Sequence, residues 1–289
     1  MTIWTVEGHR LLADGKPVPF RASPNIGGRI TEHRLLVEHY TSGSAAGAVD
    51  WLCNPDAKAS AHVVVDEDGS AVQIVPFDRV AWHAGRSSWR DVSGSVNAIS
   101  IGIEIANYGD LVGSPGRWRT EGGKAIPEDR VLVARHKDGS AARPWHTYTP
   151  AQIAAVIGIS RALHAAYRFE DVVGHEDVAP GRKTDPGPAF PMAMVRAAVM
   201  DLVAAPVFEP PRSPPLTAEA PVQTVVETSK DVQRALVALG YGPLVIDGRI
   251  GPATEAAVKR FQSIAGLVVD GDPGPKTKAS LAAAMDGRG

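Results

Sequence analysis

The sequence has little of several features that would each mark a particular class of protein. It contains one cysteine, Cys53, in 289 residues, which excludes an intramolecular disulfide framework. It has no run of eighteen or more apolar residues, so we expect no membrane span. Its net charge of −2 gives no electrostatic reason to bind nucleic acid.

The first seven residues lack a basic region followed by an apolar core, so no signal peptide is recognisable. We therefore expect a protein that stays in the cytoplasm until it is released. The hydrophobic fraction of 44% and the charged fraction of 21% are those of an ordinary globular protein. None of these values indicates an oligomeric state.

A change of composition near residue 205 divides the chain. Residues 205–228 place six prolines among Glu, Thr and Ala, a composition typical of a semi-extended linker. At 289 residues the chain also exceeds one average domain. We therefore predict a large domain over residues 1–204, a linker over 205–228 and a small domain over 229–289.

Hydrophobic patterns in the large domain predict strands mixed with helices. Strands are expected over residues 3–6, 35–41 and 98–106, and a hairpin over 61–65 and 71–75. Helices are expected over residues 44–53, from Thr149 to Tyr167, and over 191–204. The sequence thus predicts an α/β domain.

The small domain contains an internal repeat. The segment Asp-Gly-Arg-Ile-Gly-Pro-Ala-Thr at 247–254 recurs as Asp-Gly-Asp-Pro-Gly-Pro-Lys-Thr at 270–277. Each copy reads as a turn followed by the start of a helix. Short helices over 232–239, 255–264 and 277–284 would give a compact all-α module of three helices.

The residues with the clearest chemistry lie in and around one loop. Residues 174–187 bring His175, Lys183 and Asp185 together, and their Pro and Gly content forbids a regular helix through most of the segment. His39 ends one predicted strand and Glu104 lies inside another. Two imidazoles and one carboxylate suffice to hold a catalytic zinc, although nine histidines in the chain mean that spacing alone does not select these two.

Five blocks of sequence, in order, resemble the type 2 N-acetylmuramoyl-L-alanine amidases, the zinc amidases related to peptidoglycan-recognition proteins. The resemblance spans roughly residues 30–195. Its blocks are Val-Glu-His-Tyr-Thr at 37–41, Ser-Ala-His at 60–62, Ala-Trp-His-Ala-Gly at 81–85, Ser-Ile-Gly-Ile-Glu at 100–104, and Val-Gly-His at 173–175 followed by Ala-Pro-Gly-Arg-Lys-Thr-Asp-Pro-Gly at 179–187.

This resemblance implies a fold, a cofactor and a reaction. The fold would be a mixed central sheet flanked by helices. Zn²⁺ would bind His39, His175 and Asp185, with Glu104 as the general base and Lys183 stabilising the tetrahedral oxyanion. The reaction would hydrolyse the amide that joins N-acetylmuramic acid to L-alanine of the stem peptide, in peptidoglycan or in soluble muropeptides.

Three residues of the blocks are candidates for the wall of a substrate pocket. His62, Trp82 and His83 could contact the glycan or the stem peptide. They could equally well pack at the ends of strands, and the sequence leaves both interpretations open.

Three further residues are weaker candidates for substrate contact. Asn97 precedes the strand of Glu104 and could touch substrate or simply form a turn. Arg182 could bind a substrate carboxylate or cap its own loop. Tyr40 follows His39 at a position where relatives often carry Asn.

Residues 109–147 form a long excursion rich in Gly, Arg and Pro. The aromatic rings of Trp118, Trp145 and Tyr148 suit stacking on sugar rings. The alternative is a surface excursion that these aromatics pack in place.

Residues 229–289 resemble the three-helix peptidoglycan-binding module that often accompanies wall hydrolases. The resemblance rests on Val-Gln-Arg-Ala-Leu at 232–236, Gly-Tyr at 240–241, Val-Lys-Arg-Phe-Gln at 258–262 and the two repeated turns. The sequence as a whole predicts an endolysin-like or wall-lytic amidase acting at the bacterial cell wall. The alternatives are a cytosolic amidase that recycles muropeptides and a non-catalytic peptidoglycan-recognition protein.

Overall fold

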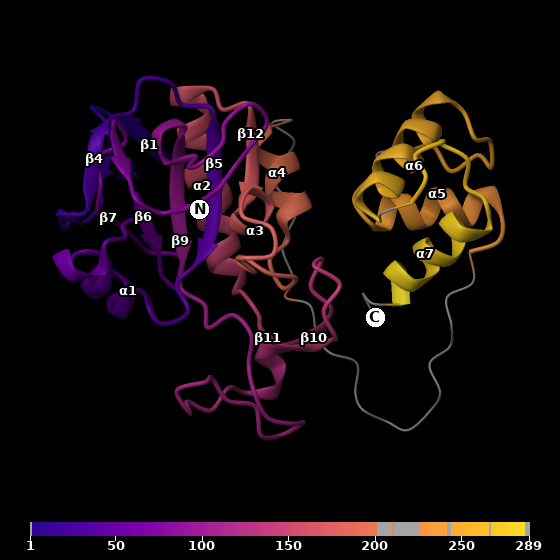
Figure 1. Cartoon of the computed structure of the whole chain (residues 1–289), viewed down its shortest axis with the longest axis horizontal. Helices are drawn as coiled ribbons and strands as arrows, with labels where there is room; N and C mark the ends of the chain where they lie inside the picture. The colour runs from indigo at the N-terminus through magenta and orange to yellow at the C-terminus, as the bar shows by residue number, and fades with distance from the viewer. Residues whose placement is uncertain (1, 201–209, 211–225, 242–243, 266, 287–289) are drawn as a thin grey trace. The chain divides into compact units, whose positions relative to one another are not determined.

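The chain divides into two compact units, residues 1–212 and 213–289. The computed structural model describes residues 2–200, 210, 226–241, 244–265 and 267–286 (Figure 1). Most of the linker predicted over 205–228 therefore lies outside the described residues, and its boundaries stay a prediction. Among the helices that are described, none has both the length and the apolar character needed to cross a membrane.

A five-stranded mixed sheet forms the centre of the first unit, as predicted (Figure 1). Its strand order is β12-β5-β9-β6-β7, in which the first four strands run parallel and β7 pairs antiparallel with β6. The strands are β5 (Leu35–Tyr40), β6 (Val63–Val65), β7 (Ala71–Gln73), β9 (Ser100–Ile105) and β12 (Asp171–Gly174). The predicted hairpin is the β6–β7 pair.

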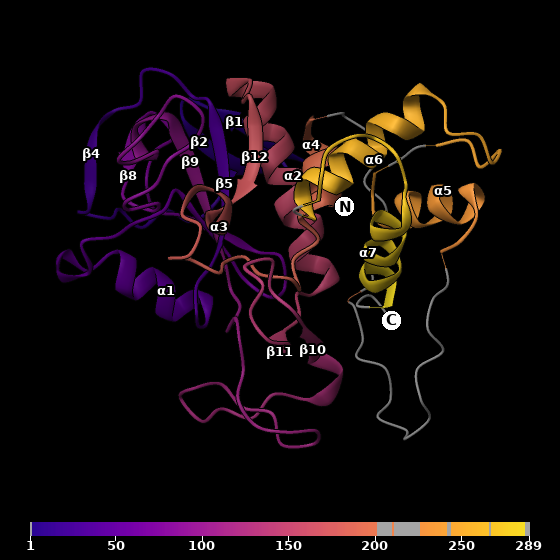
Figure 2. The same cartoon turned by 45° about the vertical axis from the view of Figure 1, so that its right-hand side comes forward.

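Helices cover both faces of this sheet. The long helix α2 (Pro150–Tyr167) and helix α4 (Met192–Met200) share one apolar core with the sheet, and α1 (Ala45–Leu52) shares a second core with β6 (Figure 2). Thr149 caps α2 in a reciprocal pair with Gln152, and Pro150 occupies its first turn, which is the predicted start. The last four residues of the helix predicted over 191–204 lie outside the described residues.

Alternation along β9 decides which side chains face the site. The isoleucines at 101, 103 and 105 lie in the core shared with α2. Because successive side chains of a strand point to opposite faces, Ser100, Gly102 and Glu104 project to the other face of the sheet. By the same alternation in β5, Leu36 lies in the core shared with α2, and His39 lies on the face of the sheet that carries Glu104.

Several short elements were not predicted. They are the strands β2 (Arg10–Ala13), β3 (Lys16–Pro17), β4 (Ile26–Arg29), β8 (Arg79–Ala81), β10 (Val131–Ala134), β11 (Arg143–His146) and β12, the 3-10 turns η1 (Pro55–Ala57), η2 (Asn97–Ile99) and η3 (Glu128–Arg130), and α3 (His175–Val178). The strand expected over residues 3–6 is β1 (Trp4–Glu7), and η2 includes residues 98 and 99, the first two of the strand expected over 98–106. Helix α3 puts a single helical turn at the start of the loop expected over 174–187.

The excursion at residues 109–147 is packed by its aromatic side chains. The exposed fractions of Trp145 and Tyr148 are 1% and 0%, and that of Trp118 is 6%. Trp145 and Tyr148 belong to the core shared with α2. Buried rings offer no face to a sugar, so the interpretation of these three residues as a glycan platform was wrong, and the packing alternative holds.

Three helices form the described part of the second unit, as predicted: α5 (Ser229–Ala238), α6 (Pro252–Ile264) and α7 (Pro275–Asp286). The internal repeat has a structural basis. The side-chain oxygen of Gln233 accepts a hydrogen bond from the Gly248 amide at 2.8 Å, and that of Gln262 accepts one from Gly271 at 2.9 Å. Both glycines have positive φ, near +84°, which explains why each turn needs glycine.

Candidate metal centre

The candidate site lies where neighbouring parallel strands end. His39, near the end of β5, lies opposite Glu104 of β9 in the strand register. Gly174, the last residue of β12, pairs with Glu38, and His175 follows directly. The carboxyl ends of parallel strands are the usual place for ligand sites in α/β folds.

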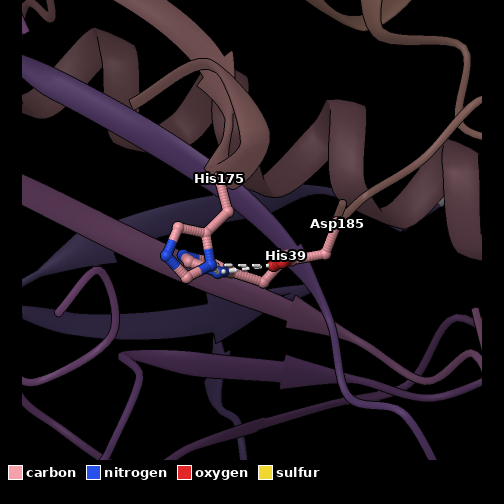
Figure 3. A group of neighbouring side chains, drawn as sticks. All are labelled: His39, His175 and Asp185. Atoms are coloured by element: carbon pink, nitrogen blue, oxygen red, sulfur yellow. Dashed lines mark hydrogen bonds and ion pairs between the residues drawn. The ribbon is translucent and has the colours of Figure 1, made fainter. Parts of the chain in front are cut away.

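Three donor atoms converge there (Figure 3). The Nδ1 atoms of His39 and His175 are 2.9 Å apart, and they lie 3.0 Å and 2.9 Å, respectively, from Oδ2 of Asp185. All three side chains are buried. Asp185 reaches the histidines because its loop folds back, with the Glu176 amide donating to the Asp185 carbonyl at 2.9 Å.

The donor set suits a metal cation. The Nε2 atom of His175 lies 3.1 Å from the Ala84 carbonyl and must donate to it, which leaves the Nδ1 lone pair facing Asp185. Burial lowers the pKa of His39 to about 4, so its imidazole is neutral near pH 7, as a metal ligand must be. Two imidazole nitrogens and a carboxylate oxygen within 4.8 Å are the ligand set of a catalytic zinc with an open position.

A cavity of about 270 Å³ opens over this cluster. Glu104 and Lys183 both line it, beside the three candidate ligands. The Glu104 Oε2 atom is buried without a hydrogen-bond partner among the described atoms. Burial, and next the charge of Asp185, raises the pKa of Glu104 well above its ordinary value, while Lys183 opposes the shift. A carboxylate in this environment has a strong tendency to take up a proton.

Four of the six candidates for substrate contact line the same cavity, namely Tyr40, Trp82, His83 and Arg182. The Tyr40 hydroxyl lies 3.0 Å from Oγ1 of Thr184, and 36% of Trp82 is exposed. Their contact with substrate stays a prediction. Arg182 also donates to the carbonyls of Ala84 and Arg86, at 2.7 and 2.8 Å, so it ties its own loop to the segment that follows β8.

His62 and Asn97 do not line the cavity. The His62 ring is fully buried, accepts from the Gly102 amide at 3.1 Å and donates to the Arg79 carbonyl at 2.9 Å. This is the packing alternative. Asn97 accepts a hydrogen bond from the Ala84 amide at 2.8 Å, so it anchors the loop that carries His83 and does not face the cavity.

Sequence reasoning missed two contributors to the site. Ala84 holds His175 through its backbone carbonyl, and no side-chain pattern reveals such a contact. Ser100 lies 3.0 Å from Nε2 of His83. The alternation of β9 could have indicated Ser100, because it shares a strand face with Glu104.

Comparison with known proteins identifies the family. Residues 29–188, more than half of the chain, match the family described as N-acetylmuramoyl-L-alanine amidase. The chain belongs to this family. Residues 227–281 match a second family, described as a putative peptidoglycan binding domain. Both resemblances proposed from the sequence are thereby confirmed.

Curated members of the amidase family share about a third of their aligned residues with this chain. The amidase AmiD of Escherichia coli is 32% identical over 55% of this chain and 50% of its own length. The 1,6-anhydro-N-acetylmuramyl-L-alanine amidase AmpD of the same organism is 34% identical over 49% of this chain and 59% of its own. The chain therefore spans only about half the length of these first relatives.

A third relative matches over most of both chains. The amidase XlyA of Bacillus subtilis is 31% identical over 86% of this chain and 91% of its own length. A solved structure of a selenomethionine derivative of AmpD is 30% identical, covers 63% of this chain and 94% of its own, and superposes with a TM-score of 0.43.

Proposed function

We propose that this protein is a zinc-dependent amidase that hydrolyses the bond between N-acetylmuramic acid and L-alanine of the peptidoglycan stem peptide. One observation carries the proposal. Nδ1 of His39, Nδ1 of His175 and Oδ2 of Asp185 converge within 4.8 Å in a cavity that Glu104 and Lys183 also line. Family membership supplies the reaction type.

Zinc would be held by His39, His175 and Asp185, which fit it in ligand type and number. When bound, zinc supplies Lewis acidity, which polarises a carbonyl and lowers the pKa of water.

The protein's own groups supply proton transfer and charge stabilisation. Glu104 accepts the proton of the attacking water, and its raised pKa and unpartnered Oε2 suit that role. It can then deliver the proton to the leaving nitrogen of L-alanine. Lys183 places a positive charge beside the oxygen on which negative charge develops. Tyr40 and Trp82 form walls of the cavity against which substrate would lie.

We propose the bacterial cell wall as the place of action. The match of residues 227–281 to a peptidoglycan-binding family supports this. A module that binds the insoluble polymer raises the effective concentration of the catalytic unit at its substrate. A small soluble muropeptide needs no such anchor, which favours wall lysis over recycling.

The deciding experiment is a digest of purified sacculi with product identification. We expect solubilised glycan and stem peptides with free L-alanine amino termini, identified by mass spectrometry. New reducing sugar ends in place of those termini would refute the amide assignment. Cleavage of soluble muropeptides with intact sacculi left unchanged would favour the recycling function, and binding without any release would favour the non-catalytic receptor.

Exhaustive chelation tests the metal. Activity should disappear on chelation and return with Zn²⁺, and His175→Ala and Asp185→Ala should each lose zinc. Full activity after complete metal removal would refute zinc dependence.

A further inference from the structure

The ring of His83 lies directly behind the candidate ligand His39. Nδ1 of His83 is 3.0 Å from Nε2 of His39, and the two rings meet edge to face with centroids 5.1 Å apart. The outer nitrogen of a ligating histidine usually donates to a carboxylate, a backbone carbonyl or water. Here its partner is a second imidazole, which can accept only through a nitrogen that carries no proton.

The contacts of Ser100 determine which nitrogen of His83 carries the proton. The Ser100 hydroxyl lies 2.7 Å from the Val96 carbonyl, and a carbonyl has no proton to give, so the hydroxyl donates there. Its oxygen can then only accept from Nε2 of His83, 3.0 Å away. His83 therefore has its proton on Nε2 and a lone pair on Nδ1.

The tautomer of His83 in turn determines the tautomer of His39 at the candidate metal site. Because Nδ1 of His83 accepts, Nε2 of His39 must donate to it. His39 then has a lone pair on Nδ1, the atom 3.0 Å from Asp185.

Gly102 leaves the space that the His83 ring occupies. A Cβ atom on Gly102 would lie 2.5 Å from Cγ of His83, a distance that side chains do not tolerate. Gly102 and Ser100 lie on the same face of β9. Two residues of β9 thus position the His83 ring: Gly102 leaves space for it, and Ser100 is hydrogen-bonded to it.

We propose that His83 and Ser100 are positioning residues, which set the tautomer of His39 so that its Nδ1 lone pair faces the metal. The hydrogen-bonded series runs from His39 through His83 and Ser100 to the Val96 carbonyl, and we call it the histidine relay. The inference rests on the proposed zinc function, and it assigns His83 a role other than substrate contact. It also makes His83 the counterpart of the Ala84 carbonyl, which holds the other histidine ligand.

The first test reads the tautomers directly. Long-range proton–nitrogen NMR spectra of the full chain, with and without zinc, should show His83 protonated on Nε2 and not on Nδ1. His39 of the zinc-loaded chain should likewise be protonated on Nε2. A proton on Nδ1 of His83 would overturn the proposal, and this measurement needs no variant.

The second test measures zinc affinity by competition with a chelator. His83→Leu, Ser100→Ala and Gly102→Ala should each weaken binding by about ten- to a hundredfold. His83→Asn, whose amide oxygen can replace the Nδ1 acceptor, should recover part of that loss. Ser23→Ala is the matched control, because the Ser23 hydroxyl is also buried and donates to a backbone carbonyl, that of Leu52, but is hydrogen-bonded to no residue of the relay.

The outcomes separate this inference from the proposed function. Unchanged zinc affinity in the correctly folded relay variants would overturn the relay. A chain that binds zinc with the expected tautomers but releases no stem peptide would refute the amidase proposal and leave the relay standing.

Discussion

A substitution of Glu104 tests whether metal binding and proton transfer are carried out by different residues. Glu104→Gln keeps the size of the side chain but removes its ability to accept a proton. We expect turnover on muropeptides to fall by about 10²–10⁴-fold, with zinc content unchanged, because Glu104 is not one of the three converging donors. Kinetics combined with metal analysis checks both. Near-normal turnover by the zinc-loaded variant would show that another group takes the proton.

His62 gives a pH dependence of stability that is independent of the metal ligands. Burial lowers its pKa from 6.5 to about 4, so between these pH values the unfolded chain binds more protons than the folded one. The free energy of unfolding should therefore fall as the pH falls through this window, by at most about 1.4 kcal/mol per pH unit from this ring.

Urea unfolding of the metal-free chain at several pH values measures this slope. His62→Leu should be less stable at pH 7, since Gly102 loses its acceptor, but its slope between about pH 4 and 6.5 should be shallower. Identical slopes in the two proteins would contradict the assignment.

At the residue scale, the site residues that lie within a recognisable sequence motif could be predicted. His39, Glu104, His175, Lys183 and Asp185 were all predicted, and the structure brings them to one cavity. The partners that orient them were not predicted as such. Hydrogen bonds from His39 to His83 and from His175 to Ala84 join positions 44 and 91 residues apart, and only the folded sheet brings these positions together.

At the element scale, the excursion at 109–147 braces the short helix α3. His136 forms an ion pair or hydrogen bond with the buried Glu176. Lys137 lies 2.8 Å from Glu176 and 2.5 Å from Asp177. Since His175 begins α3, these contacts hold the backbone that presents a candidate ligand, which gives the excursion a structural role.

The substitution Lys137→Met tests whether these contacts stabilise α3. This substitution removes one ion-pair partner of the buried Glu176 carboxylate. We expect the free energy of unfolding to fall by about 1–3 kcal/mol. Amide protons of α3 should also exchange faster. The exposed Lys16→Met serves as the control substitution. In a Glu176→Gln background the effect of Lys137→Met should shrink, and strict additivity of the two changes would argue against a direct pairing.

Elements were predictable where the sequence carries a cap, a turn or a periodic signal. The eighteen residues of α2 carry a cap, a proline in the first turn and a sustained apolar period, and β9 carries a strict alternation. By contrast, β12 has four residues and α3 has four, too few for a periodic signal. They form because β12 pairs with β5 and because Asp177 closes a capping pair with the Gly174 amide.

At the scale of the whole molecule, the catalytic and wall-binding roles should separate. All the candidate catalytic and metal-binding residues lie within residues 29–188, and the match to a peptidoglycan-binding family begins at residue 227. The first unit also has its own apolar cores. A fragment of residues 1–204 should therefore cleave soluble muropeptides at close to the rate of the full chain.

On intact sacculi the same fragment should lose most of its activity, because it loses the module that would keep it at the polymer. We expect the amount bound in a pelleting assay to fall by about a hundredfold, with solubilisation slowed at low enzyme concentration and restored at high concentration. A fragment of residues 226–289 should pellet with sacculi without releasing peptides. Equal binding by residues 1–204 and the full chain would show that the catalytic unit itself recognises the wall, and the second unit would then need another role.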